Sequence, residues 1–149
     1  MRAVIQRVSR ADVEVSEKCI GKISQGLLVL LGIQEGDKEA DLLMIVKKIL
    51  SLRIFSDREG KMNLSVLDIQ GDLLVISQFT LIADLKSGNR PSFFQAAKPD
   101  IAKSMFDHAV KEFRKSTLKV ETGEFGANMK VCLVNDGPVT ICLDSREWK

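Results

Sequence analysis

The sequence has only one histidine and no tyrosine among its 149 residues. A single histidine excludes HExxH proteases, histidine-rich metal sites and phosphotransfer schemes that use two histidines. Without tyrosine, no phenol can serve as acid or nucleophile. The three cysteines, Cys19, Cys132 and Cys142, are widely spaced and form no CxxC pair. We therefore expect reduced, buried thiols and neither a disulfide framework nor a metal site.

Long apolar runs and a strong excess of one charge are also missing. No run approaches the ~20 apolar residues that span a bilayer, and the start MRAVIQRVSR lacks the pattern of a signal sequence. We expect a cytoplasmic protein with no membrane partner. The 22 Lys and Arg against 20 Asp and Glu give a net charge of +2, far below the balance of proteins that coat duplex nucleic acid. Contact with nucleic acid must therefore be local.

Hydrophobic periodicity predicts an alternation of strands and helices. The length, the 45% apolar share and the 28% charged share predict one globular domain over residues 1–149. The apolar run at residues 26–33 is typical of a central strand covered on both faces. Apolar spacing predicts one amphipathic helix with Asp37 as N-cap, and a second that begins at Pro99 and ends near Lys115.

Further strands are expected on both sides of these helices. We predict a hairpin-like start at residues 2–8 and 11–15, strands at 72–83 and 118–121, a late hairpin at 129–134 and 139–143, and a loop with at most a short strand at 56–71. The fold class is α/β: a single domain with a curved or barrel-like mixed β-sheet and two main helices packed on it.

A polar segment, Ser77-Gln78-Phe79-Thr80, interrupts the strand predicted at residues 72–83. Buried polar groups without partners cost about 1–3 kcal/mol, so these side chains need hydrogen bonds or a ligand. Strand alternation places Gln78 and Thr80 on one face. One interpretation is a strand that ends at the sheet rim. The other is catalytic: because no histidine adjoins Thr80, backbone N–H groups near Phe79 and Thr80 would stabilise an oxyanion.

A second segment, Asn135-Asp136-Gly137-Pro138, separates the last two predicted strands. Asp-Gly is a strong signal for a hairpin turn, and Pro138 can open the following strand. The alternative is a cis Gly137–Pro138 bond. In that geometry the two carbonyls could point the same way and hold an ammonium group.

Other side chains have both a structural and a functional interpretation. Arg7 is either a solvated cation at the end of a strand or a group that holds a carbonyl or phosphate. His108 lies where the apolar face of the second helix meets solvent, which is typical of a surface histidine. Two groups complete the candidates: Phe125, Ala127 and Met129, as core residues or as an apolar slot for a planar ring, and Lys86, Arg90 and Lys98, as a solvated loop or as partners of a phosphate backbone.

These segments together resemble the D-aminoacyl-tRNA deacylase family, also called the D-tyrosyl-tRNA deacylase family, whose members remove D-amino acids from tRNA. The resemblance runs nearly end to end through MRAVIQRVSRADVEV, GLLVLLGI, RIFSDREGKMNL, LLVISQFTL, NRPSF and VCLVNDGPVT. SQFT together with NxGPxT is specific, whereas either motif alone is weak. At Glu124 and Asn128 this sequence departs from residues that related sequences often have. Both positions lie in the loop that the resemblance places beside the adenine.

The resemblance implies a proofreading hydrolase that acts as a homodimer on the acceptor 3′ end of aminoacyl-tRNA. It would cleave the ester of D-aminoacyl-tRNA, release the free D-amino acid and tRNA, and need no metal or cofactor. Gly137 and Pro138, as a cis dipeptide, would enter the active site of the neighbouring subunit, hold the α-amino group and reject L side chains. Glycine has no side chain to reject, so glycyl-tRNA would also be a substrate.

The resemblance also implies roles for individual residues. The 2′-hydroxyl of the terminal ribose would assist the attack of water. The catalytic pocket would consist of Ser77, Gln78, Phe79 and Thr80; Arg7 and Asn135 would support the Gly-Pro element; Phe125, Ala127 and Met129 would bind the terminal adenosine.

Two other functions stay open at this point. A non-catalytic module would bind the tRNA end or a D-amino acid without turnover. A different esterase or peptidase would use Thr80 as a true nucleophile and form an acyl-enzyme. The sequence does not specify the preferred amino acid or tRNA.

Overall fold

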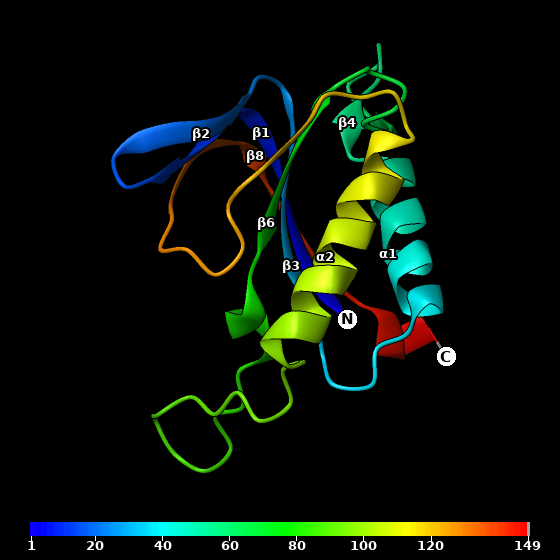
Figure 1. Cartoon of the computed structure of the whole chain (residues 1–149). Coiled ribbons are helices and arrows are strands. Elements are labelled where there is room, and N and C mark those ends of the chain that lie inside the picture. Colours follow the sequence, from blue (N-terminus) through cyan, green and yellow to red (C-terminus); the bar gives the residue numbers. More distant parts are fainter. Residues whose placement is uncertain (149) are drawn as a thin grey trace.

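The apolar segments assemble into a curved, barrel-like sheet that carries helices on one face (Figure 1). The computed structural model describes residues 1–148, which form a six-stranded mixed sheet, a separate two-stranded ladder and two α-helices. The elements are β1 (Arg2–Val15), β2 (Lys18–Ile23), β3 (Gly26–Gly32), α1 (Glu39–Ser51), β4 (Phe55–Ser56), β5 (Met62–Leu64), β6 (Asp72–Ser77), the 3₁₀ turn η1 (Phe79–Ile82), α2 (Pro99–Arg114), β7 (Val120–Thr122), β8 (Lys130–Asp144) and the 3₁₀ turn η2 (Ser145–Trp148).

Strand β1 organises the sheet because it pairs along both of its edges. One edge pairs antiparallel with β3 and then with β2, and the other pairs antiparallel with β8 over nearly its whole length. The order continues through parallel pairs from β3 to β6 and from β6 to β7. The predicted fold class, a barrel-like mixed sheet with two main helices packed on it, is therefore confirmed.

Strand β3 lies inside the sheet and is covered on both faces, as predicted. Leu27, Val29 and Leu31 belong to the larger core, which α1 and α2 cover. Leu28 alternates to the opposite face and joins a smaller core with Val8 and other side chains of β1 and β6. Each fully buried leucine contributes about 1.5–3 kcal/mol relative to exposure.

The second helix is confirmed and the start of the first needs a correction. Helix α2 begins at Pro99 in the first helical position. The N-cap of α1 is Lys38, not Asp37. The Asp37 carboxylate instead accepts hydrogen bonds from the buried α-ammonium of Met1 (2.7 Å) and from the backbone N–H of Gln34 (2.7 Å). The Asp37 side chain, which the sequence pattern predicted as the N-cap, therefore makes a tertiary ion pair instead.

Both predicted hairpins are wrong, because each is a single long strand. Residues 2–15 form β1 without a turn, and β8 runs continuously from 130 to 144. The two strands pair with Gln6 opposite Thr140 and Val8 opposite Asn135, so Arg7 alone stands opposite four residues of β8. These four residues, Asp136 to Val139, form a bulge, which we call the 136–139 bulge.

The strand predicted at residues 72–83 is also shorter in the structure. β6 ends at Ser77 and the chain turns into η1, which covers Phe79 to Ile82. The strand alternation expected for Gln78 and Thr80 therefore does not apply. In the predicted loop at 56–71, β5 pairs with β4, close to the short strand expected there.

The three cysteines are free, but all three are exposed, so the expectation of buried thiols is wrong. Two of them lie on β8, which pairs only with β1 within residues 1–148 and so leaves its other edge uncovered. Among the described residues, neither helix is long and apolar enough to cross a membrane. The same residues contain no cluster of His, Cys, Asp or Glu that could hold a metal ion.

Candidate active site

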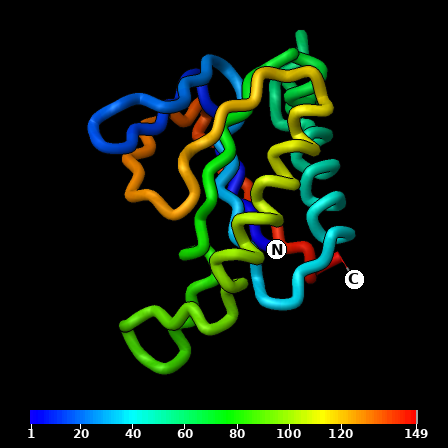
Figure 2. The backbone as a smooth tube through the Cα atoms, viewed as in Figure 1, coloured from blue at the N-terminus to red at the C-terminus, as the bar shows by residue number. Residues whose placement is uncertain are grey.

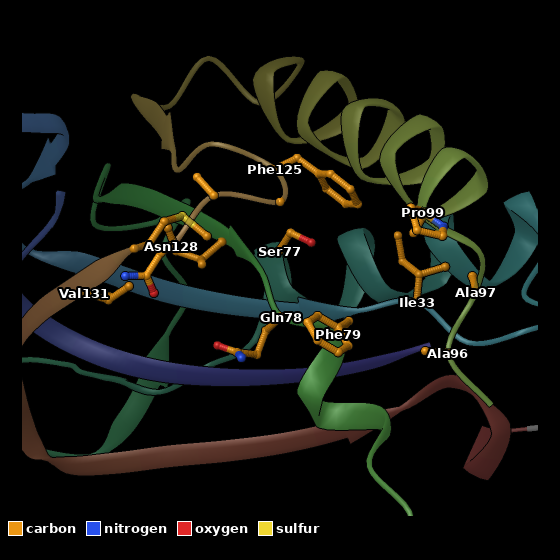
Figure 3. A pocket seen from close by; sticks show the side chains of 15 residues that line it. Ile33, Ser77, Gln78, Phe79, Ala96, Ala97, Pro99, Phe125, Asn128 and Val131 are labelled. Carbon is orange, nitrogen blue, oxygen red and sulfur yellow. The ribbon is translucent and has the colours of Figure 1, made fainter. Parts of the chain in front are cut away.

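A cavity of about 450 Å³ opens where β6 ends (Figure 3). One wall is Ser77, Gln78 and Phe79, at the junction between β6 and η1. The opposite wall comes from the segment that leads into α2 and from the loop between β7 and β8. The predicted polar segment therefore lies beside a cavity, as a functional site requires.

Backbone contacts fix the junction between β6 and η1. The N–H of Gln78 donates to the carbonyl of Leu31 at 2.8 Å, which extends the parallel ladder by one bond beyond β6. Gly32 permits this approach, because a Cβ there would lie 2.9 Å from the Gln78 carbonyl oxygen. Across the part of the chain that the structure describes, the N–H groups of Phe79 and Thr80 have no acceptor, as is usual in the first turn of a helix.

The side chains of the polar segment differ in their placement. Ser77, Gln78 and Phe79 line the cavity, whereas Thr80 is exposed and does not belong to its wall. The side-chain amide of Gln78 donates to the Thr80 hydroxyl. The Phe79 ring packs edge-on against Phe93, with ring centroids 4.9 Å apart.

The opposite wall contains the planar-ring candidates. Phe125, Ala127 and Met129 all line the cavity, and the Phe125 ring lies 6.2 Å from that of Phe106 on α2. Figure 3 shows Phe125 and Asn128 on the loop that faces Ser77 across the cavity. The departing residue Asn128 is thus part of the wall, whereas Glu124 is not.

Sequence reasoning missed the third part of the wall. Ala96, Ala97 and Pro99 border the cavity where the chain enters α2. Pro99 gave a signal for the start of a helix, but the two alanines carry no chemical signal that could have marked them as part of a site.

The cavity has no ionisable side chain. Among its fifteen lining residues, all within the described chain, the polar side chains are those of Ser77, Gln78 and Asn128. The carboxyls with a lowered pKa lie elsewhere: hydrogen bonds lower the pKa of Asp57 and Asp68, and the Lys115 ammonium is the main cause for Glu112. Burial raises the pKa of Asp144, but hydrogen bonds and nearby positive charges outweigh this effect and leave it below its ordinary value. The wall therefore offers hydrogen bonds and apolar contact, without a general acid or base.

The 136–139 bulge is the second candidate functional element, after the cavity. The Gly137–Pro138 peptide bond is cis, and both residues are exposed. Arg7 holds the bulge from the side: its Nε donates to the carbonyl of Asp136 at 2.8 Å and its Nη1 to the carbonyl of Ile54 at 2.6 Å. The turn interpretation of this segment is replaced by a bulge in a continuous strand.

Asn135 closes the base of the bulge. Its Oδ1 accepts the N–H of Val139 at 2.7 Å, and its Nδ2 donates to the Val139 carbonyl at 3.1 Å and to the Thr140 hydroxyl at 3.2 Å. Side chains on both sides thus fix the exposed Gly137 and Pro138. Neither residue lines the cavity of its own chain.

The remaining candidates lie outside the cavity wall. Lys86 and Arg90 are exposed in the loop before α2, and Lys98 precedes Pro99 as the N-cap of that helix. His108 is half-exposed, with Nε2 3.7 Å from Glu39 and 3.4 Å from Glu112. The interpretation of His108 as a surface residue is confirmed.

Comparisons with known proteins show the family to which the chain belongs. The family model described as D-Tyr-tRNA(Tyr) deacylase matches residues 4–144. Relatives named D-aminoacyl-tRNA deacylase come from Thermosipho africanus (57% identical over 147 residues), Kosmotoga olearia (58% over 147) and Aquifex aeolicus (55% over 147), and each alignment covers 99% of both chains.

Two solved structures share the fold. One, the c-Myc DNA Unwinding Element Binding Protein, has a TM-score of 0.91 and 42% identity and covers 97% of this chain and 98% of its own. The other, described as a probable eukaryotic D-amino acid tRNA deacylase, has a TM-score of 0.82 at 18% identity and covers 95% and 97%.

The names of these relatives define a class of hydrolases, the deacylases that act on aminoacyl-tRNA. The match over residues 4–144 is more specific. The chain belongs to the D-Tyr-tRNA(Tyr) deacylase family.

Proposed function

We propose that this chain hydrolyses the ester between a D-amino acid and the terminal ribose of tRNA, and so removes D-amino acids before they reach translation. The observation that carries the proposal is the cavity beside Ser77, Gln78 and Phe79 in a chain that matches deacylases along its full length. The products are the free D-amino acid and tRNA. An aminoacyl-tRNA substrate also implies action in the cytoplasm.

The cavity wall favours a reaction in which the RNA supplies part of the chemistry. A water oxygen attacks the ester carbonyl, the acyl C–O bond to the ribose breaks, and the ribose oxygen leaves as a hydroxyl. We assign stabilisation of the oxyanion to the free N–H groups of Phe79, which lines the cavity, and of Thr80, the next residue in the chain. Because no lining side chain is ionisable, we assign assistance of the water to the neighbouring 2′-hydroxyl of the terminal ribose, and no metal or cofactor.

The terminal adenosine would occupy the apolar side of the same cavity. Phe125 and Met129 offer an aromatic face and a thioether, which suit a purine ring, and Ala127 leaves room for it. The ester would then lie near Ser77 and Gln78, across the cavity.

Chirality is the second part of the proposal. We infer that the chain acts as a homodimer in which Gly137 and Pro138 of one subunit enter the cavity of the other, hold the α-amino group and exclude L side chains. Two observations support this arrangement: the exposed bulge is rigidly held but lies outside its own cavity, and β8 has a free outer edge. Long free edges are usually covered in folded proteins.

Exclusion of this kind acts only on a side chain of the wrong hand. Glycine has none, so glycine attached to a tRNA, including one that belongs to another amino acid, would be hydrolysed as well. A measurable rate on glycyl-tRNA with sparing of L-alanyl-tRNA is the expected pattern. Equal rates on both would contradict exclusion by Gly137 and Pro138.

The catalytic proposal is tested by product analysis. D-aminoacyl-tRNA is incubated with catalytic amounts of the purified protein and a chelator, and the free amino acid and intact tRNA are quantified. Multiple turnovers support the proposal. Binding without release would favour the non-catalytic module, and loss of the reaction in chelator would contradict a metal-free mechanism. An acyl adduct on Thr80, detected by mass spectrometry, would favour the nucleophile mechanism.

The cross-subunit arrangement is tested with mixed dimers. Subunits with Gly137→Ala have an altered bulge, and subunits with Ala127→Trp have a filled cavity. Each variant alone should be nearly inactive. If the bulge acts on the partner's cavity, mixing them should restore one intact site per heterodimer, whereas no recovery in proven heterodimers would place the bulge at its own cavity.

The name of the 42% identical structure concerns DNA binding. A net charge of +2 does not favour a broad duplex-binding surface on this chain. The cavity and the relatives named as deacylases therefore favour hydrolysis of aminoacyl-tRNA.

A further inference from the structure

A large apolar side chain is fully presented to solvent close to the cavity. Phe94 is 93% exposed, the highest value among the exposed large apolar residues of the described chain. It lies in the segment between η1 and α2, which extends away from the sheet and both helices (Figure 2). We refer to residues 84–95 as the projecting loop. A single exposed apolar side chain is common on protein surfaces and does not by itself mark an interaction surface. The residues around Phe94 supply the further observations.

The backbone on both sides of Phe94 is anchored. Asp84 and Ser92 exchange two backbone hydrogen bonds of 2.8 and 2.9 Å at the base of the projecting loop. The carbonyl of Gln95 accepts the N–H of Glu35 at 2.9 Å. Phe94 therefore stands between two fixed points, and its exposure does not come from a free chain end.

The projecting loop continues directly into the cavity wall. Phe93 packs against Phe79, which lines the cavity, and Ala96 and Ala97 line it two and three residues beyond Phe94. A strand whose last unit fills the cavity passes this segment when it leaves on the side where Ala96 and Ala97 lie. The Phe94 side of the exit is the one that offers an unburied aromatic ring.

The charge of this segment is mainly positive. Residues 84–99 contain three cations, Lys86, Arg90 and Lys98, and one carboxylate, that of Asp84, whose Oδ1 accepts the backbone N–H of Lys86 at 2.8 Å. A small set of cations around an exposed aromatic ring is the combination that binds single-stranded nucleic acid, with bases on the ring and phosphates on the cations. A second protein subunit would gain from the apolar ring but not from the unbalanced cations.

We propose that Phe94 stacks on the penultimate base of the tRNA 3′ strand, while Lys86 and Arg90 contact the adjoining phosphates. This inference rests on the proposed function, in which the terminal adenosine occupies the cavity. It makes the projecting loop a second recognition element that binds the substrate strand without touching the ester. Phe94 is then a binding residue and not a catalytic one.

The test compares three D-aminoacyl substrates of increasing length: aminoacyl-adenosine, an aminoacyl tetranucleotide with the tRNA 3′ sequence, and full tRNA. Stacking of a base on an aromatic ring corresponds to roughly 5- to 150-fold in affinity. Phe94→Ala should raise KM by about that factor for the two longer substrates, with kcat unchanged, and should not alter hydrolysis of aminoacyl-adenosine. Phe94→Trp should retain the low KM. Leu43→Ala, a change to a 43% exposed apolar residue on α1, is the matched control.

The phosphate contacts have a separate readout. Binding of the tetranucleotide without an attached amino acid is measured by fluorescence anisotropy at several salt concentrations. Two lost phosphate contacts should reduce the slope of log K against log salt by about 1.4 in the double variant Lys86→Ala, Arg90→Ala. This measurement does not require hydrolysis, so it remains informative if the proposed reaction fails.

The outcomes separate the explanations. Equal loss on aminoacyl-adenosine would mean that Phe94 supports the cavity itself, and no loss on any substrate or in RNA binding would also overturn the proposal. A change from dimer to monomer in Phe94→Ala, measured by analytical ultracentrifugation, would identify a second copy as the occupant of this surface. If the wild type hydrolyses nothing yet binds RNA through Phe94, the inference survives and the proposed reaction does not.

Discussion

Substitution of Gly137 by alanine tests the most specific geometric feature of the molecule. Gly137 has φ of +145°, a conformation that residues with a side chain rarely adopt. A Cβ at this position would lie 2.7 Å from Cγ2 of Val139 and 2.9 Å from Nη2 of Arg7. Alanine must therefore either move the bulge or displace the guanidinium that holds it.

The size of the effect follows from this geometry. Holding a side-chain-bearing residue in a sparsely populated backbone region costs about 1–3 kcal/mol, so the free energy of unfolding should fall by that amount or the bulge should relax. A displacement of about 1 Å in a positioning element reduces a rate by roughly 100-fold. We expect hydrolysis of D-aminoacyl-tRNA to fall by about that factor while the protein stays folded.

The assay combines urea denaturation with initial rates on D- and L-aminoacyl-tRNA. Gly60→Ala is the control, because Gly60 also has a positive φ (+78°) but no atom within 4 Å of an added Cβ. This control should lose some stability and keep its activity. Full activity and full chiral selectivity in a folded Gly137→Ala protein would refute the role given to the bulge.

Three further predictions concern other parts of the chain. Thr80→Ala should reduce kcat far less than loss of a nucleophile would, because the Thr80 hydroxyl is outside the cavity wall; a loss comparable to that of a catalytic nucleophile would contradict this view. The Asp37 carboxylate and the Met1 ammonium form a buried ion pair, in which the side chain of Asp37 is 1% exposed and that of Met1 0%. Asp37→Asn removes the negative partner and should lower the free energy of unfolding by about 3–5 kcal/mol, measured by urea denaturation. The backbone N–H and the hydroxyl of Ser65 lower the pKa of Asp68 below its ordinary value of 3.8. The contribution of Asp68 to stability is therefore present above that value and is lost as the pH falls through the lower pKa of the folded state. Asp68→Asn should make the free energy of unfolding fall less steeply with decreasing pH in the acid range. An unchanged acid dependence would contradict this.

The sequence predicted the strongly periodic parts of the fold. The continuous apolar run of β3 and the Pro99 start of α2 carry local signals that agree with their tertiary setting. The two false hairpins arise at two neighbouring irregularities of the β1–β8 ladder: one where Arg7 stands opposite the 136–139 bulge, and one between Val8 and Arg10. Asn-Asp-Gly-Pro is a sequence typical of a turn, but β8 pairs with β1 both before and after this segment and therefore stays continuous.

The candidate site was predictable where polar residues interrupt an apolar pattern. Ser77 and Gln78 stood out for that reason, and the structure places both beside the cavity. The end of β6 was not predictable, because the residues of η1, Phe79 to Ile82, fit the pattern of a strand as well as that of a 3₁₀ turn. Exposed Cys132 and Cys142 were misjudged since the sequence does not reveal that β8 has a free edge.

The most direct test of the central claim is the decay of a D-aminoacyl-tRNA and its L counterpart, measured in parallel with catalytic amounts of the wild-type protein. Hydrolysis with chiral exclusion by Gly137 and Pro138 predicts rapid loss of the D ester and decay of the L ester at its spontaneous rate. Loss of both esters at similar rates would contradict chiral exclusion by Gly137 and Pro138, and loss of neither would contradict the assignment of the cavity as a deacylase site.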